Sequence, residues 1–326
     1  MKIFKRHNNQ SGIALMVVLW VLVLLIALAT EFAYSMKGEV NATKNYKEDI
    51  EAYHIAKAGI NLAMAEILYP SSFHAIHKDY GLVSGKLTPG VKKDNPEINK
   101  NPYRIPLRTN IQFGRGTITY TLEDENKKIP INKTTRDILV KVLTLTGVET
   151  GENKDIIADS ILDWIDADKN HRLNGAENEF YQDLTPPYFP KNAPLENLDE
   201  LIKVRGINKK ILYGTGQHPG LNQFYTAYNI EKVNPNTSSL ELLSTIFSIP
   251  QAKMILKKRE KMGFYDNTKS NYFKVTSTGK LEGSATNHTI VAVMQRILEK
   301  NSPVILTHYW NDNSFLNVYN QKQETS

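Results

Sequence analysis

The sequence predicts an α+β fold, in which a long N-terminal α-helix packs on an antiparallel β-sheet and a large all-α domain is inserted. The apolar run of residues 13–29 continues as a helical pattern without a breaker to about Leu68. Two segments with strand character, residues 116–122 and 288–298, lie far apart in the chain. The helical patterns between them therefore predict an insertion within one sheet domain.

The first element is predicted to be a retained membrane helix. Residues 13–29 carry no charge and span about 26 Å as a helix, close to the hydrocarbon thickness of a bilayer. Lys2, Lys5 and Arg6 precede the run and favour a cytoplasmic N-terminus. The alternative is a signal peptide cleaved after Ala29, but the run is longer than the usual apolar region of about 7–15 residues.

Beyond Ala29 the helix is predicted to become amphipathic and to end at Pro70. Residues 71–101, rich in Gly, Pro, Lys and Asn, are predicted to be a surface loop. The apolar or small positions recur near a 3.6-residue spacing and form a predicted stripe from residue 46 to residue 67: Tyr46, Ile50, Tyr53, Ala56, Ile60, Ala63 and Ile67.

The remaining elements divide the chain into a sheet domain and its insertion. Strands are expected at residues 104–113 and 116–122, a short extended run at 129–132, and two closing strands at 272–278 and 288–298. Helices are expected at 134–145, 154–165 and 195–204, and 233–237 is expected to begin a helix pair at 240–247 and 250–262. The predicted segments are a leader (1–12), a membrane segment (13–29), a first sheet part (30–132), the helical insertion (133–225), a second sheet part (226–310) and a polar tail (311–326).

Bulk composition excludes several classes of function. The 326 residues are 41% hydrophobic and 23% charged, which is typical of a globular protein. The chain has no cysteine, so disulfides, thiolate metal sites and a cysteine nucleophile are excluded. The net charge of +6 is spread over stretches of mixed sign and does not require a nucleic-acid partner.

A carboxylate-rich loop after the 154–165 helix is a candidate cation site. Oxygen ligands at alternate positions of a tight loop suit calcium, although His171 stands where an EF-hand loop needs glycine. From the residues alone, a solvated acidic turn that caps the preceding helix is an equal alternative. The candidate donors occupy EF-hand positions 1, 3, 5, 9 and 12, with one more beyond: Asp166, Asp168, Asn170, Asn174, Glu177 and Glu179.

Residues 195–207 and 234–263 resemble helix-hairpin-helix units, which hold DNA in other proteins. Their hairpins need glycine-rich backbone whose N–H groups approach a phosphate. The first hairpin keeps only Gly206, and Pro250 offers no N–H group in the second. The basic run at residues 257–261 is typical of a solvated helix face, so the units are interpreted as scaffold.

The junction between Gly12 and Ile13 resembles the processing site of type IV prepilins and type II secretion pseudopilins. In these families a prepilin peptidase cuts after the glycine and methylates the new amino group, which would make Ile13 the first mature residue. The families carry glutamate at the fifth mature position, where this chain has Val17. A carboxylate inside a membrane needs a partner, so Val17 suits the end of a filament better than a repeating position.

Three motifs extend the resemblance to the K component of type II secretion, the GspK family, over nearly the whole chain. They are DENKKIPIN at residues 124–132, DWIDAD at 163–168 followed by GAE at 175–177, and VNPNT at 233–237. The resemblance implies a pilin-like fold, and a minor pseudopilin that acts by assembly and not as an enzyme. It also implies calcium binding in the helical domain.

The resemblance further implies a location and partners. The protein is expected to span the inner membrane once, with its large domain in the periplasm. It would stand at the pseudopilus tip, where it initiates or caps assembly for export of folded proteins across the outer membrane. The expected partners are the I and J minor pseudopilins, whose N-terminal helices would lie against the 46–67 stripe, and the secretin or exported proteins. No nucleic-acid partner is expected.

Two alternatives belong to other classes of function. The first is a helix-hairpin-helix DNA-binding protein of a competence or type IV pilus system, for which salt-dependent duplex binding would be the sign. The second is a secreted hydrolase released after Ala29, which would be found in the medium with Thr30 at its N-terminus.

Overall fold

The computed structural model describes residues 10–68, 73–77, 81–84, 108–149, 151–262, 264–300 and 302–312. Most of the predicted leader (1–9), most of the predicted 71–101 loop, positions 104–107 of the first predicted strand and the tail beyond residue 312 lie outside the described residues.

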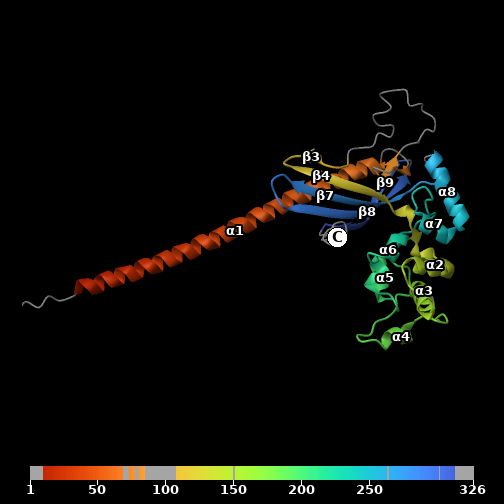
Figure 1. The fold of residues 1–326 in the computed structure, drawn as a ribbon, viewed down its shortest axis with the longest axis horizontal. Helices are drawn as coiled ribbons and strands as arrows, with labels where there is room; N and C mark the ends of the chain where they lie inside the picture. The colour runs from red at the N-terminus through yellow and green to blue at the C-terminus, as the bar shows by residue number, and fades with distance from the viewer. Residues whose placement is uncertain are drawn as a thin grey trace, which may run out of the picture.

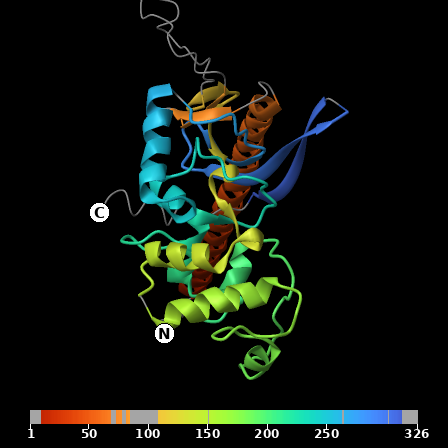
Figure 2. The ribbon, with the colours of Figure 1, turned by 90° about the vertical axis from the view of Figure 1, so that its right-hand side faces the viewer.

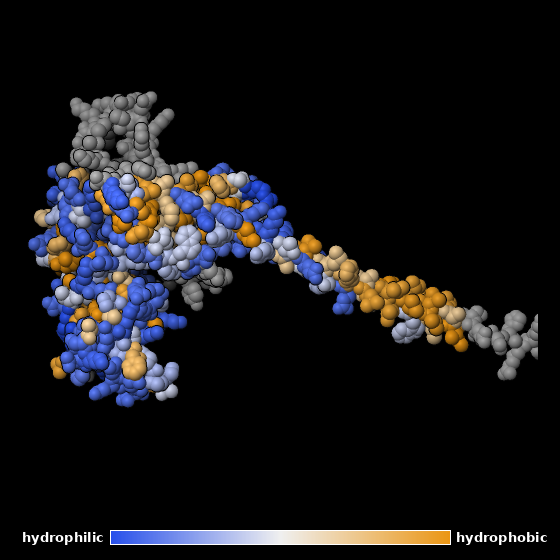
Figure 3. Space-filling model, turned by 180° about the vertical axis from the view of Figure 1, so that it is seen from behind, coloured by the Kyte–Doolittle hydropathy of each residue, from blue (hydrophilic) through white to orange (hydrophobic). Residues whose placement is uncertain are grey.

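A single helix, α1 (Gln10–Leu68), forms the N-terminal part of the chain, as predicted. It ends just before Pro70, which cannot continue the helix. Its first half projects from the folded body as a straight rod (Figure 1). The outer part of this rod is an almost continuous apolar surface (Figure 3), and its second half packs on the sheet.

The main sheet has five antiparallel strands in the order β3-β4-β7-β8-β9. Alternate residues of β4 are buried, which is the pattern of a strand with one face on a core. This core lies between α1 and the sheet, so the predicted fold class is confirmed (Figure 1). The strand bounds are β3 (Ile111–Phe113), β4 (Gly116–Asp124), β7 (Tyr272–Leu281), β8 (Asn287–Glu299) and β9 (Ser302–Asn311).

The helix and the sheet approach each other closely where small residues face one another. A Cβ atom on Gly279 would lie 2.2 Å from the carbonyl oxygen of Ala52, so only glycine fits there. Beside it, the hydroxyl of Ser277 donates a hydrogen bond to the carbonyl of Ala56 at 2.7 Å. Ile60 and Ile67 are fully buried in the same interface. The second half of α1 is therefore an integral part of the sheet domain.

This packing corrects one prediction. The 46–67 stripe was expected to receive the helices of partner proteins, but Ala56, Ile60 and Ala63 are fully buried against the chain's own sheet. Only the beginning of the stripe is open, since Tyr46 and Ile50 are exposed. A partner helix must therefore use the exposed part of α1, up to about Ile50.

The helical domain is inserted between β4 and β7, which are neighbours in the sheet although far apart in sequence. Two short strands, β5 (Ile129–Pro130) and β6 (Tyr225–Thr226), pair in parallel and hold the beginning and the end of the insertion together. Figure 2 shows its helices below the sheet. They are α2 (Arg136–Leu145), α3 (Glu152–Ile165), α4 (Asn178–Gln182), α5 (Lys209–Tyr213) and α6 (Leu221–Phe224), with 3-10 helices η2 (Glu125–Lys127), η3 (Ile131–Lys133) and η4 (Leu198–Lys203).

The insertion has a hydrophobic core of its own, separate from that of the sheet. Its buried residues run from Ile129 to Leu242, somewhat beyond the 133–225 range expected for the insertion. Trp164 and Tyr181 meet edge to face in this core, with ring centroids 5.1 Å apart. A third cluster lies between α7 (Leu240–Ile246) and α8 (Ile249–Met262).

Four local predictions are wrong. A hairpin, β1 (Phe73–His77) and β2 (Gly81–Ser84), lies within the predicted loop. Three strands and not two close the sheet, because β9 follows β8. Pro303 weakens the strand signal of β9 in the sequence, but proline is tolerated there because β9 is an edge strand. The predicted 195–204 helix is the shorter 3-10 helix η4. Residues 233–237 form a turn, because their side chains bond to β4 and not to a helix.

Candidate functional site

The residues predicted for processing and assembly lie at the free end of the α1 rod. Gly12 and Ile13 fall in its first turns, and Ile13 and Val17 are both more than half exposed. Among the described residues, α1 alone is long and apolar enough to cross a membrane, and none of its apolar window is buried. So large an apolar surface requires lipid or other helices to cover it.

Between the membrane segment and the sheet, α1 carries a second open surface. At 3.6 residues per turn, Phe32, Met36, Val40 and Ile50 fall on one side of the helix. This side faces away from the one that Ala63 buries in the sheet. All four side chains of this outer stripe are exposed. The outer stripe, and not the buried part of the 46–67 stripe, is therefore a helix surface open to a neighbour.

The first and third motifs meet in a buried polar cluster where the sheet joins the insertion. The buried Asp124 carboxylate accepts hydrogen bonds from the hydroxyls of Thr237 and Ser270, each at 2.5 Å, and from the Asn234 amide at 3.1 Å. It also accepts one from the Asn126 backbone N–H at 2.8 Å. Burial raises the pKa of Asp124, and these donated hydrogen bonds oppose the rise.

Asn126 continues the cluster. Its side-chain oxygen accepts hydrogen bonds from the backbone N–H groups of Asn271 and Tyr272, at 3.0 and 2.9 Å. Its backbone carbonyl accepts one from Asn234 at 2.7 Å. The end of β4, residues 233–237 and the start of β7 are thereby held together at one point. These two motifs thus have a structural role, to fix the insertion on the sheet.

The second motif builds the acidic loop at the end of α3. Asp163 is fully buried, and its carboxylate accepts hydrogen bonds from the backbone and the guanidinium of Arg172. The same guanidinium donates to Asp166 Oδ2 at 2.6 Å. A Cβ atom on Gly175 would lie 1.8 Å from Asp163 Oδ2, which explains the glycine of the GAE segment. Arg172 thus neutralises part of the charge of the loop from within.

Three oxygen atoms near this loop are buried and have no hydrogen-bond donor among the described residues. They belong to Asp166 (Oδ1), Glu177 (Oε1) and Asn192 (Oδ1). The Asn192 amide nitrogen donates to Glu177 Oε2 at 3.2 Å and to the Asp168 carbonyl at 3.1 Å, which brings the two loops together. Carboxylate, amide and carbonyl oxygens are the ligands of calcium. In chemical type, these oxygens therefore suit a hard dication.

The electrostatic environment of Glu177 also suits a bound cation. Burial raises the pKa of Glu177, and the negative charges of Asp163 and Asp166 raise it further, against the hydrogen bond from Asn192. A bound dication would stabilise the ionised carboxylate in this position.

The other predicted ligands are not brought to these oxygens. Asn170 is exposed, and its backbone N–H donates to Asp168 Oδ1. The Asn174 amide donates to Asp159, and Glu179 lies exposed in the first turn of α4. No group of three or more His, Cys, Asp or Glu side chains converges on a metal position in the described ranges. The EF-hand spacing therefore does not produce EF-hand geometry.

Two residues of the site were missed by sequence reasoning. Asn192 lies in the proline-rich stretch after the loop, and no spacing rule connects it to Glu177. Its left-handed backbone, with φ at 45°, is a conformation that asparagine favours, but the sequence alone does not reveal it. Arg172 occupies the seventh loop position, where an EF-hand offers only a backbone carbonyl. The spacing rule therefore gives its side chain no role.

The two hairpins that resemble DNA-binding units use their groups inside the chain. The Arg205 N–H donates to the Tyr181 hydroxyl at 3.2 Å, and its guanidinium donates to the Gly175 carbonyl. In the second unit Arg259 donates to the carbonyls of Pro235 and Ser238. These contacts hold both hairpins against other parts of the chain.

Comparisons with known proteins point to one family. The family described as "Type II secretion system (T2SS), protein K" matches residues 120–213. A putative type II secretion system protein K of Escherichia coli (strain K12) is 26% identical over 219 residues, which make up 63% of this chain and 60% of the relative. The match therefore spans less than two thirds of that relative. Type II secretion system protein K of Aeromonas hydrophila is 24% identical over 283 residues, or 79% of this chain and 78% of the relative.

The fold is also similar to a solved structure. A chain in the crystal structure of the GspK-GspI-GspJ complex from the enterotoxigenic Escherichia coli Type 2 Secretion System matches with a TM-score of 0.56 and 16% identity. The match covers 85% of this chain and 99% of that chain. At this identity the likeness shows a shared fold.

Proposed function

The chain belongs to the protein K family of type II secretion, and from this premise we propose that it is the minor pseudopilin at the tip of a pseudopilus. It initiates or caps the fibre that exports folded proteins across the outer membrane, and it acts by assembly and not by catalysis. The observation that carries this proposal is the wholly exposed apolar half of α1. Such a rod anchors the chain in the inner membrane before assembly and packs beside sister helices afterwards.

The shape of the molecule supports the proposed position at the tip. In Figure 1 the helical insertion lies at the end of the body opposite to the free end of α1. A subunit added beyond this end would collide with the insertion. Val17, at the position where a repeating subunit carries glutamate, removes the buried carboxylate that would need a neighbour's amino group.

The partners are proposed from the solved relative, which is in complex with GspI and GspJ. The corresponding minor pseudopilins of the same system would lay their helices along the outer stripe of α1. Contacts with the secretin or with exported proteins would use the insertion, which lies at the end of the body away from the free end of α1 (Figure 1).

The mature N-terminus tests this function. We expect intact mass analysis of the protein from its native membrane to show a cut after Gly12 and a methylated Ile13. The protein should also co-purify in detergent with its I and J partners. A mature chain that begins at Thr30, or an uncut Met1, would contradict the proposal.

We also propose that calcium binds at the acidic loop through Asp166, Glu177, Asn192 and the carbonyl of Asp168. The three partnerless oxygens support this set. When bound, the ion would supply positive charge to buried acceptors and would join the loop to the proline-rich segment.

Thermal unfolding of the full-length chain in detergent tests the calcium site. At a hundredfold excess over its dissociation constant, calcium should add about 2.7 kcal/mol, or roughly 5–10 °C in Tm. Glu177→Gln should lose this shift, whereas Glu179→Gln, an exposed neighbour outside the oxygen set, should keep it. Equal Tm values with and without a chelator would remove calcium from the proposal.

A further inference from the structure

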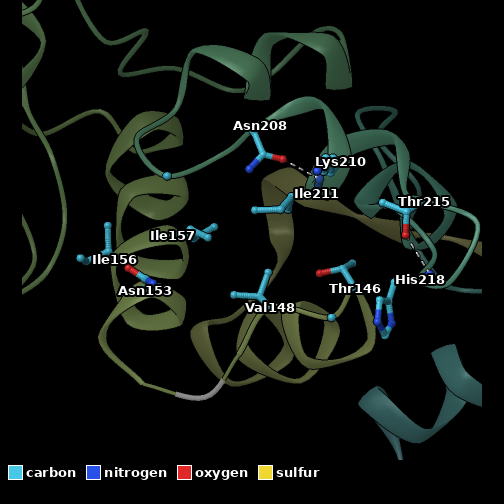
Figure 4. A pocket seen from close by; sticks show the side chains of 12 residues that line it. Thr146, Val148, Asn153, Ile156, Ile157, Asn208, Lys210, Ile211, Thr215 and His218 are labelled. Atoms are coloured by element: carbon cyan, nitrogen blue, oxygen red, sulfur yellow. Dashed lines mark hydrogen bonds between the residues drawn. The ribbon is translucent and has the colours of Figure 1, made fainter.

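A pocket of about 460 Å³ lies in the insertion, at the end of α3 opposite to the acidic loop. Its floor is aliphatic, with Val148, Ile157 and Ile211 from the loop after α2, from α3 and from α5. Figure 4 shows these side chains turned toward one another, with Lys210 and His218 around them. The volume falls within the range of pockets that hold small ligands or a few residues of a peptide.

The pocket lining has basic side chains and no acidic ones among its described residues. Lys210 and His218 are the basic residues, Asn153 and Asn208 contribute amides, and none of the described lining residues is an aspartate or glutamate. An apolar floor beside a cationic rim is complementary to an apolar group that carries a negative charge.

Other ligand classes fit this lining less well. The described lining residues include a single histidine and no carboxylate or thiolate, so they do not form a metal site. They include one lysine and no aromatic ring other than the imidazole of His218, so bases have little to stack on and phosphates few charges to meet.

The positions of the two kinds of group narrow the class further. Lys210 and Ile211 both line the pocket from α5, so a positive charge and an aliphatic surface border the same cavity. At the end of a polypeptide, the carboxylate and the last side chain are attached to the same carbon atom. A C-terminal residue therefore presents both complementary groups together, whereas an internal acidic residue carries its charge on a separate side chain.

We propose that this pocket binds the C-terminus of a partner polypeptide that ends in an aliphatic residue. The last side chain lies on the floor formed by Val148, Ile157 and Ile211, and the free carboxylate pairs with Lys210. The site goes beyond the proposed assembly function, because the outer stripe of α1 belongs to a different part of the molecule.

Calorimetric titration of the full-length chain in detergent tests the site. The probes are the tripeptide Ala-Ala-Leu with a free carboxylate, the same peptide as a C-terminal amide, and Ala-Ala-Ser with a free carboxylate. Since a hydrogen bond to a charged group contributes about 1.5–3 kcal/mol, the amide should bind at least about tenfold more weakly than the acid. The serine peptide should also bind more weakly.

The variants Lys210→Glu and Lys209→Glu provide a matched pair, because both lysines are exposed on α5 but Lys209 does not line the pocket. Lys210→Glu should weaken binding of the free acid by about tenfold or more, and Lys209→Glu should leave it within about twofold. Equal binding of acid and amide, tighter binding of Ala-Glu-Leu amide, equal losses in both variants, or no binding of any probe would overturn the proposal. None of these results affects co-purification with the pseudopilin partners, so the two proposals fail separately.

Discussion

Asp124 shows how much structure one buried carboxylate can organise. It accepts hydrogen bonds from side chains that lie 110 to 146 residues further along the chain. The insertion is therefore fixed to the sheet by a polar cluster and not only by its short β5–β6 pairing. Removal of this one acceptor takes away the hydrogen bonds that the buried Ser270 hydroxyl and the Asn126 N–H donate to it, while Thr237 and Asn234 each keep a second acceptor.

We expect Asp124→Ala to lower the free energy of unfolding by about 3 kcal/mol or more, because a stranded buried donor costs about 1–3 kcal/mol. Asp124→Asn, which keeps one acceptor oxygen, should cost less. Thr121→Ala, at an exposed position of the same strand, should stay within about 0.5 kcal/mol of the wild type. Urea unfolding measures all three. Equal costs for Asp124→Ala and Thr121→Ala would show that the cluster adds no stability.

The raised pKa of a single residue, Glu177, predicts that the stability of the protein depends on pH. Its pKa is raised in the folded protein, so ionisation opposes folding. The contribution of this group to stability is present at low pH and is lost as the pH rises above its ordinary value of about 4.5. In metal-free buffer, the unfolding free energy of the wild type should fall relative to that of Glu177→Gln as the pH rises above this ordinary value. With calcium the shift should reverse, since the ion needs the ionised carboxylate. Parallel curves for the two proteins would contradict the prediction.

At the scale of elements, two of the ion pairs that join α1 to the rest of the sheet domain differ in burial. Glu66 pairs with Arg108 in the interior and also accepts a hydrogen bond from Tyr120 at 3.1 Å. Glu51 pairs with Arg115 at the surface, where the arginine side chain is 73% exposed. The pairs join the same helix to the same region, so they form a natural comparison.

Glu66→Ala should destabilise the protein by about 3–5 kcal/mol, because it removes a buried carboxylate that pairs with the buried guanidinium of Arg108. Glu51→Ala should cost at most about 1 kcal/mol, because water and salt screen the exposed pair. Denaturant titration of the two variants measures the difference. Losses of equal size would mean that burial does not separate the pairs.

The long helix and the central strands could be predicted from the sequence because their periodicity is strong and local. The residues 116–122 and 288–298 became the central parts of β4 and β8. The partner stripe was misassigned because periodicity reveals an apolar face but not what covers it. At the acidic loop the spacing indicated carboxylates, but Asn192 comes from another loop and only the fold places it beside Glu177.

At the scale of the whole molecule, the folded body and the α1 rod present separate surfaces. Figure 3 shows the apolar rod outside the mostly polar body. The outer stripe connects the two, and its side chains support no core within the described part of the chain. Assembly and stability should therefore be separable by mutation.

We expect Met36→Asp to abolish co-purification with the I and J partners and to leave the Tm of the body unchanged, because Met36 lies on the exposed outer stripe. Tyr34→Asp is the matched control, since Tyr34 is exposed on the opposite side of α1. Pull-down from detergent and thermal unfolding give the two readouts. Retained assembly in Met36→Asp, or equal loss in Tyr34→Asp, would show that the outer stripe is not the contact surface.

The parallel pairing of Ile129 with Tyr225 has a consequence for how such a chain could arise. Because both ends of the helical domain leave the sheet side by side, a short linker could replace everything between them without moving a strand. An ancestral fibre subunit could therefore have acquired the domain in a single insertion event, without a change in the fold of the subunit.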